Sequence, residues 1–107
     1  MLYKFKSKAS GDLIMLEPNG RRVLEIIGKD PGPTGIVLPP EMEAAAAALE
    51  QAIAREEAQQ QALIDEARAA GKEPPEFDAI SLRQRAVPMI DMLRRCAVAQ
   101  REIVWGV

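Results

Sequence analysis

Histidine is missing from this sequence, cysteine occurs once, and aromatic residues make up only 4% of the chain. A single thiol excludes a disulfide within one chain, and zinc sites built from cysteine and histidine lack their ligands. Acid–base catalysis by histidine is excluded for the same reason. With so few aromatic rings, the core must consist of small aliphatic side chains. We predict no catalytic, cofactor-binding or metal-binding residue and expect a protein that is not an enzyme.

Long hydrophobic segments are also lacking. The first ten residues, MLYKFKSKAS, contain no apolar segment typical of a signal peptide, and no run approaches the roughly 18 apolar residues of a membrane span. We therefore expect a cytoplasmic protein with no membrane partner. A length of 107 residues favours a single domain over residues 1–107.

The formal net charge of −2 conceals an uneven distribution. Residues 1–29 carry six basic and three acidic side chains, and residues 81–107 carry five and two. Residues 30–80 carry three basic and eleven acidic side chains. Basic chain ends can indicate a nucleic-acid surface. Alternatively, the acidic block is a solvated helix whose charge the two ends balance.

The clearest helix covers residues 81–99, which read SLRQRAVPMIDMLRRCAVA. Ser81 and Gln84 form a capping-box pattern at its start. Apolar residues then recur at steps of three and four, as on one face of an amphipathic helix. Cys96 lies on this face and is interpreted as core. Pro88 either produces a tolerated kink or frees the carbonyl of Gln84 for a ligand or partner.

Strands are predicted at the two chain ends. Residues 2–8 alternate, with Tyr3 and Phe5 on one face, and residues 103–107 place Ile103, Trp105 and Val107 on one face. Their pairing is the simplest arrangement. Residues 12–16 fit a strand or a helical turn, and residues 36–38 are extended and apolar. A short helix is expected over residues 21–27, with Asn19 as its N-cap and Gly28 beyond its end.

A long helix is predicted from residue 41 to residue 70, after two prolines and before Gly71. Thirty residues would span roughly 45 Å, whereas a compact domain of this size has a radius of gyration of about 13 Å. Its apolar stripe is interrupted by Glu56 and Gln60. Residues 55–76 are therefore expected to form a helical extension and a turn, unless the helix bends near Glu56 and returns.

Together these elements predict an α+β fold. A small, antiparallel sheet of two or three strands comes from the chain ends. It packs against two or three helices, one of them long. The helix at residues 81–99 and the first half of the long helix cover the sheet.

Four sequence blocks carry a family resemblance: LYKFKSKASGDLIML, LEIIGK, SLRQRAVPMIDML and a C-terminal IVWGV. In this order they resemble an uncharacterised bacterial family of small proteins, a domain of unknown function. Two stretches depart from the family pattern. The pattern implies a more helical stretch at residues 16–20, and the segment around residues 56–70 is longer than the family needs. The resemblance implies no activity, cofactor or site residue.

Two surfaces are candidates for function. The first is a possible basic surface, which comprises Lys4, Lys6, Lys8, Arg83, Arg85, Arg94, Arg95 and Arg101. The second is a possible self-association patch on the helical extension, which comprises Leu63, Ile64 and Ala67. We expect a small interaction or regulatory protein that forms a homodimer through this patch, or that uses it for another protein partner. The alternative is a nucleic-acid-associated protein that uses the basic chain ends.

Overall fold

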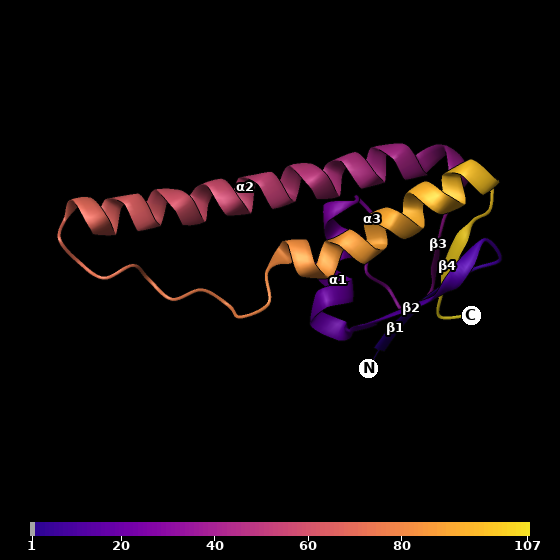
Figure 1. The fold of residues 1–107 in the computed structure, drawn as a ribbon. Helices are drawn as coiled ribbons and strands as arrows, with labels where there is room; N and C mark the ends of the chain where they lie inside the picture. Colours follow the sequence, from indigo (N-terminus) through magenta and orange to yellow (C-terminus); the bar gives the residue numbers. More distant parts are fainter. Residues whose placement is uncertain (1) are drawn as a thin grey trace.

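The computed structural model describes residues 2–107 and shows an α+β fold with a four-stranded antiparallel sheet (Figure 1). The strands are β1 (Leu2–Ser7), β2 (Ser10–Leu16), β3 (Gly35–Val37) and β4 (Ile103–Trp105), in the order β2-β1-β4-β3. β1 pairs with β4, so the predicted pairing of the two chain ends is confirmed. The predicted number of two or three strands is wrong, because β2 and β3 both belong to the sheet.

Each additional strand is defined by the strand with which it pairs. β2 closes a hairpin with β1, which decides between strand and helical turn for residues 12–16. β3 has only three residues and pairs with β4 across most of the chain length. The loop before it is held in place by two side chains. Tyr3 donates to the carbonyl of Pro31 (2.7 Å), and the Trp105 indole donates to that of Gly32 (3.1 Å).

Helix α1 spans Glu17–Ile26 and begins earlier than expected. Asn19 lies inside the helix, so its predicted role as N-cap is wrong; the cap position is Leu16. Pro18 is accommodated because the first turn of a helix has no internal partner for its backbone N–H groups. The helical stretch implied by the family resemblance is therefore present. Gly28 follows the helix with a φ of 83°, as predicted for a glycine beyond its C-terminus.

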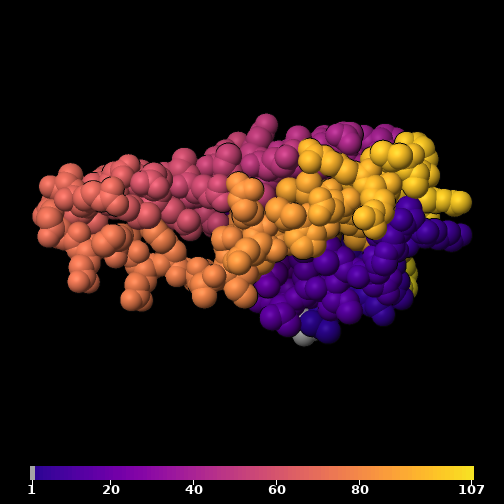
Figure 2. Space-filling model, viewed as in Figure 1, coloured from indigo at the N-terminus to yellow at the C-terminus, as the bar shows by residue number. Residues whose placement is uncertain are grey.

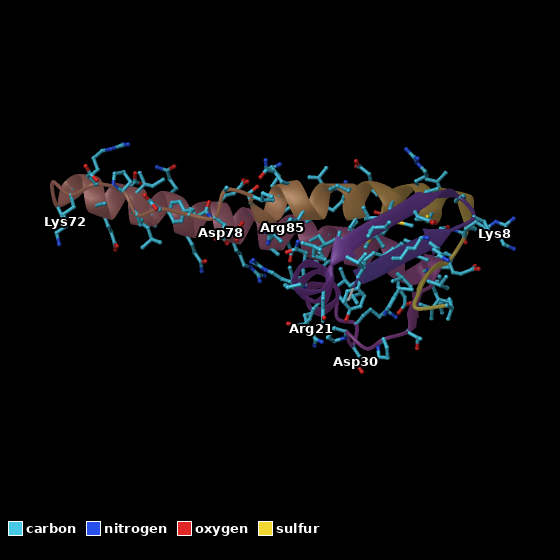
Figure 3. The ribbon with its side chains drawn as sticks, turned by 90° about the horizontal axis from the view of Figure 1, so that it is seen from below. Lys8, Arg21, Asp30, Lys72, Asp78 and Arg85 are labelled. Atoms are coloured by element: carbon cyan, nitrogen blue, oxygen red, sulfur yellow. The ribbon has the colours of Figure 1, made fainter. Side chains whose placement is uncertain are left out.

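The long helix is confirmed. A 3₁₀ turn, η1 (Pro39–Glu41), leads into α2 (Met42–Ala69), which continues through Glu56 without interruption. α3 (Leu82–Ala99) starts at the predicted capping box, in which the Gln84 N–H donates to the Ser81 hydroxyl (3.2 Å). α2 and α3 run antiparallel and pack against each other, and α1 packs on the sheet (Figures 1 and 3). The alternative of a helix that bends back near Glu56 is thereby excluded.

The core is one cluster of aliphatic and aromatic side chains between the sheet and the helices. Phe5, Leu49, Leu93 and Cys96 are fully buried in it, so the interpretation of Cys96 as core is confirmed. Val107 does not share the buried face of Ile103 and Trp105. It is 75% exposed, because β4 ends at Trp105 and Gly106 turns away with a φ of 76°.

The molecule is elongated, with extents of 52 × 28 × 22 Å and a radius of gyration of 16.0 Å. A compact chain of about this length has a radius of gyration near 13 Å. The excess comes from the C-terminal half of α2, which extends beyond the rest of the fold (Figure 1). The predicted overhang is therefore present.

Leu93 tests the assignment of the α3 faces. Truncation of this fully buried side chain by Leu93→Ala should lower the free energy of unfolding by roughly 2–5 kcal/mol, through lost transfer energy and the cavity left behind. Val98 is on the same helix and is 88% exposed, so Val98→Ala should change the stability by less than about 0.5 kcal/mol. Denaturant titration measures both values, and equal losses would contradict the assignment.

Gly106 tests the junction between the C-terminal strand and the loop before β3. A Cβ atom at this position would overlap the Pro33 carbonyl, and the positive φ itself costs an L-residue about 1–2 kcal/mol. Gly106→Ala should therefore destabilise the fold by at least that amount in thermal or denaturant unfolding. Gly11→Ala is the matched control, because a Cβ there meets no atom within 4 Å. A Gly106→Ala variant as stable as the Gly11→Ala variant would show that the loop is not packed against Gly106.

Candidate functional site

The most unusual part of the molecule is a projection that we call the arm, defined as residues 57–80 (Figures 1 and 2). It consists of the end of α2 and an extended segment that returns to the start of α3. The last buried residue of α2 is Ile53. Every residue of the returning segment, 71–80, is exposed. The arm therefore contributes almost nothing to the core.

The predicted self-association patch lies on the arm. Leu63 is 46% exposed, and Ile64 and Ala67 are partly buried. These residues continue the helix face that Leu49 and Ile53 bury against the rest of the protein, since they follow at helical spacing. On the arm this face meets no core. The structure thus places the three predicted residues together on one helix, with Leu63 the most accessible of them.

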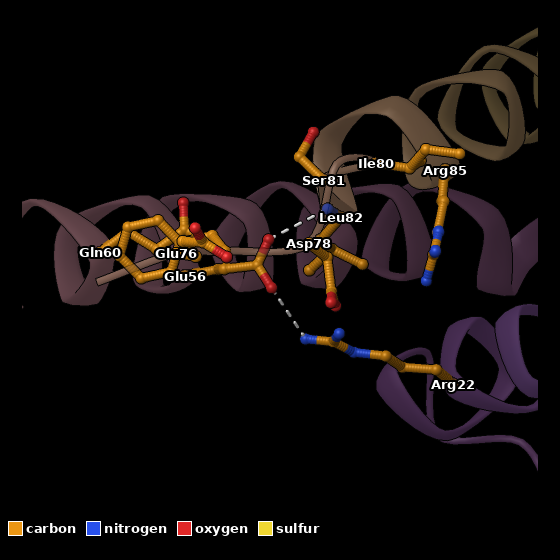
Figure 4. A pocket seen from close by; sticks show the side chains of 10 residues that line it. Arg22, Glu56, Gln60, Glu76, Asp78, Ile80, Ser81, Leu82 and Arg85 are labelled. Atoms are coloured by element: carbon orange, nitrogen blue, oxygen red, sulfur yellow. Dashed lines mark hydrogen bonds and ion pairs between the residues drawn. The ribbon is translucent and has the colours of Figure 1, made fainter. Parts of the chain in front are cut away.

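The arm begins at Glu56, whose carboxylate joins three helices (Figure 4). One of its oxygens accepts the backbone N–H of Leu82 in the first turn of α3 (3.0 Å). The other pairs with the Arg22 guanidinium of α1 (3.3 Å). A negative charge at a helix N-terminus is favoured by the helix dipole and by the free N–H groups there. Glu56 is therefore an anchor that fixes where α2 leaves the core.

A hollow of about 250 Å³ adjoins this anchor at the base of the arm (Figure 4). Its wall contains basic side chains, acidic side chains and one aromatic ring. The lining residues that carry them are Arg22, Arg85, Glu56, Glu76, Asp78 and Phe77. The Nε atom of Arg85 is buried without a hydrogen-bond partner. Over residues 2–107, no group of three or more histidine, cysteine, aspartate or glutamate side chains is arranged to hold a metal ion.

Two of the predicted basic residues form ion pairs between α3 and α2. Arg83 donates two hydrogen bonds to Glu57 (2.8 and 2.9 Å), and Arg94 pairs with Glu50. The hydrogen bonds from Arg83 lower the pKa of the Glu57 carboxyl and raise the pKa of the guanidinium. These pairs are exposed and are screened by solvent. Each pair joins an acidic side chain of α2 to a basic side chain of α3, so the predicted basic residues Arg83 and Arg94 are partly neutralised.

The other basic residues are distributed over different parts of the molecule. Lys4 pairs with Asp12 across the hairpin (3.5 Å). Lys6 and Lys8 line a shallow hollow near the β1–β2 turn. Arg85 lies at the base of the arm, and Arg95 lies between α3 and β2. Arg101 is exposed near the start of β4, and one basic surface formed by all eight residues stays a prediction. Nucleic-acid binding stays a prediction.

Sequence reasoning missed the role of Glu56 and its partner Arg22. The sequence predicts Glu56 as a polar interruption of an apolar stripe and not as an anchor between helices. The interruption itself was the available signal, since a single carboxylate within such a stripe needs a polar partner when the stripe is buried. Its partners lie 26 and 34 residues away in sequence, so no local pattern identifies them.

The fold and the arm define a small α+β domain with a helical projection, and no helix in the described residues is long and apolar enough to cross a membrane. Residues 1–105 match the family described as a domain of unknown function (DUF1840), so the chain belongs to that family. This agrees with the resemblance to an uncharacterised family of small proteins. No curated protein and no solved structure matches the chain.

Glu56→Ala tests the anchor. The variant leaves the N–H of Leu82 and the guanidinium of Arg22 without their carboxylate, so it should destabilise the fold by about 1–3 kcal/mol in denaturant titration. Glu50→Ala removes a carboxylate of the same helix from an exposed ion pair and should have a smaller effect. Glu56→Gln keeps an acceptor for Leu82 and should lie between wild type and Glu56→Ala. An alanine variant as stable as wild type would show that Glu56 is not an anchor.

Proposed function

We propose that this chain is a non-enzymatic interaction protein that forms a homodimer through its arm. The observation that supports the proposal most directly is the position of Leu63, which is half-exposed on a helix that projects beyond the core. Burial of a leucine side chain contributes about 1.5–3 kcal/mol. A second copy supplies the partner surface that the fold itself does not provide.

The length of the arm adds to this argument. Isolated helices shorter than about 12–15 residues are only marginally formed in water. The portion of α2 beyond Glu56 is about this long, and none of its residues is buried in the core. Two arms that pack against each other stabilise each other's helices, and a two-fold axis is the most common symmetry for such a pair. The face that takes part consists of Leu63, Ile64 and Ala67.

Polar residues beside this face set the register of the two arms. Glu56 is bonded within its own chain, so Gln60 is the polar residue nearest the patch that remains for this role. A polar side chain at such a position selects one register over others in paired helices. The mate contributes either its own arm or its core to the contact.

Light scattering with size-exclusion chromatography tests the proposal. At tens of micromolar, the wild type should have the mass of two chains. The double variant Leu63→Glu/Ile64→Glu should have the mass of one chain, because it places carboxylates in the contact without changing the core.

Ala58→Glu/Ala62→Glu is the matched control, since both alanines are exposed on the opposite face of the same arm. It adds the same charge and should remain dimeric. A monomeric wild type, or a double variant that stays dimeric, would contradict self-association through the arm.

A further inference from the structure

A groove runs along the free side of β2, between this strand and α3. Two hollows of about 240 and 270 Å³ form it. One is lined by the first half of β2 and the other by the second half, and Leu13 and Pro88 line both. The two hollows therefore join at these residues into one groove along the whole strand.

One wall of the groove is a sheet edge. β2 is the terminal strand of the sheet and pairs only with β1 among the described strands. On its other side, its N–H and C=O groups have no neighbouring strand. Such an edge is a template for an additional strand. Seven residues of β2 offer an edge of roughly 23 Å.

The other wall is α3, and Pro88 interrupts its hydrogen bonding on this side. Proline has no N–H, so the carbonyl of Gln84 lacks its regular donor from the next turn. Gln84 and Pro88 line the same hollow. The freed backbone acceptor therefore belongs to a residue that lines the groove. This favours the second of the two roles that the sequence allows for Pro88, in which the freed carbonyl binds a partner.

The charges along the groove are unequal. The half beside Leu16 and Asn19 contains Arg85 and no acidic side chain, and the Nε of Arg85 is buried without a partner. In the other half, Asp12 and Asp91 accompany Arg95. A carboxylate at this end would pair with the Arg85 guanidinium, and a charge-assisted hydrogen bond of this kind is among the strongest available.

We propose that the groove binds an extended segment of another protein as a fifth strand beside β2. An apolar side chain of the segment lies over Leu13 and Pro88, and an acidic side chain or a C-terminal carboxylate pairs with Arg85. A second copy docked through its own β2 is disfavoured. Paired strands lie about 5 Å apart, and each β2 has α3 packed beside it. The two copies of α3 would then lie too close together, because packed helices need about 8–10 Å between their axes.

Selection from a random dodecapeptide phage library against the full chain tests this proposal. Enriched peptides should combine alternating apolar residues with an aspartate or a glutamate. The best peptide, fluorescently labelled, is then titrated in fluorescence anisotropy. Arg85→Gln should weaken its binding about tenfold, the effect of losing one strong hydrogen bond. Arg94→Gln, on the same helix but paired with Glu50, should leave the affinity unchanged.

Backbone methylation provides a readout that a merely structural role of Arg85 would not affect. Alternate N–H groups of an added strand point toward β2. Peptide methylated at one alternating set of nitrogens should lose binding, and peptide methylated at the other set should retain it. The Leu63→Glu/Ile64→Glu variant should bind the parent peptide normally, which separates this site from the arm.

Three results would overturn the proposal: no enriched peptide, equal affinity for Arg85→Gln and wild type, or equal binding of both methylated peptides. Enrichment of sequences that match residues 72–80 would instead identify the arm of a second copy as the occupant, and would also overturn the assignment to another protein.

Discussion

The packing of α2 on α3 is the contact on which the rest of the structure depends. It buries Met42, Leu49 and Ile53 of one helix with Ala86 and Leu93 of the other. The sheet alone is small, since β3 and β4 have three residues each. The two helices supply the apolar surface that such a sheet needs for stability. They also fix the arm, because α3 starts opposite Glu56 while α2 continues beyond it.

A single carboxylate ends this contact. Before Glu56, the inner face of α2 is apolar and buried. At Glu56 it becomes polar, and this side chain accepts the Leu82 N–H in the first turn of α3 and pairs with Arg22 of α1. Beyond it the same face is apolar again at Leu63 but meets no core. The N-terminal half of α2 therefore stabilises the fold, and the C-terminal half has a surface that can contact a partner. The proposed homodimer uses this C-terminal half.

Arg85 lies where the base of the arm meets the groove to which we assign peptide binding. It lines both the hollow at the base of the arm and the groove beside β2. Its neighbours in the hollow include Asp78 of the returning segment (Figure 4). A carboxylate that enters the groove and Asp78 therefore approach the same guanidinium from different sides. Occupation of the groove and the position of the returning segment are expected to influence each other through this residue.

Much of this architecture follows from patterns within single elements. The capping box at Ser81, the spacing of apolar residues in α3 and the alternation of Tyr3 with Phe5 each specify local structure, and all three predictions are confirmed. The length of α2 also predicts the arm, because no breaker occurs before Gly71. The wrong number of strands has a physical cause. β3 is too short for a periodic signal, and it is a strand only because β4 lies beside it.

The same limit applies to the candidate site. The sequence predicts the patch on the arm, because apolar residues of the long helix continue beyond the length that one small domain can cover. The patch consists of Leu63, Ile64 and Ala67. The hydrogen bond from Leu82 to Glu56 and the groove beside β2 could not be predicted, because each is made by elements far apart in the chain. Asn19 shows the opposite error. Its local signal for a helix cap is good, but the chain enters α1 directly from β2 and the helix starts before it.

Hydrogen exchange along α2 tests the central claim most directly. The account predicts that the amides of residues 46–56 are protected at every protein concentration, because this half packs on α3. The amides of residues 60–69 should exchange rapidly in dilute solution and become protected as the concentration rises, when a second arm covers them. Equal protection of both halves in a dilute, monomeric sample would contradict the account, and so would an arm that stays unprotected at every concentration.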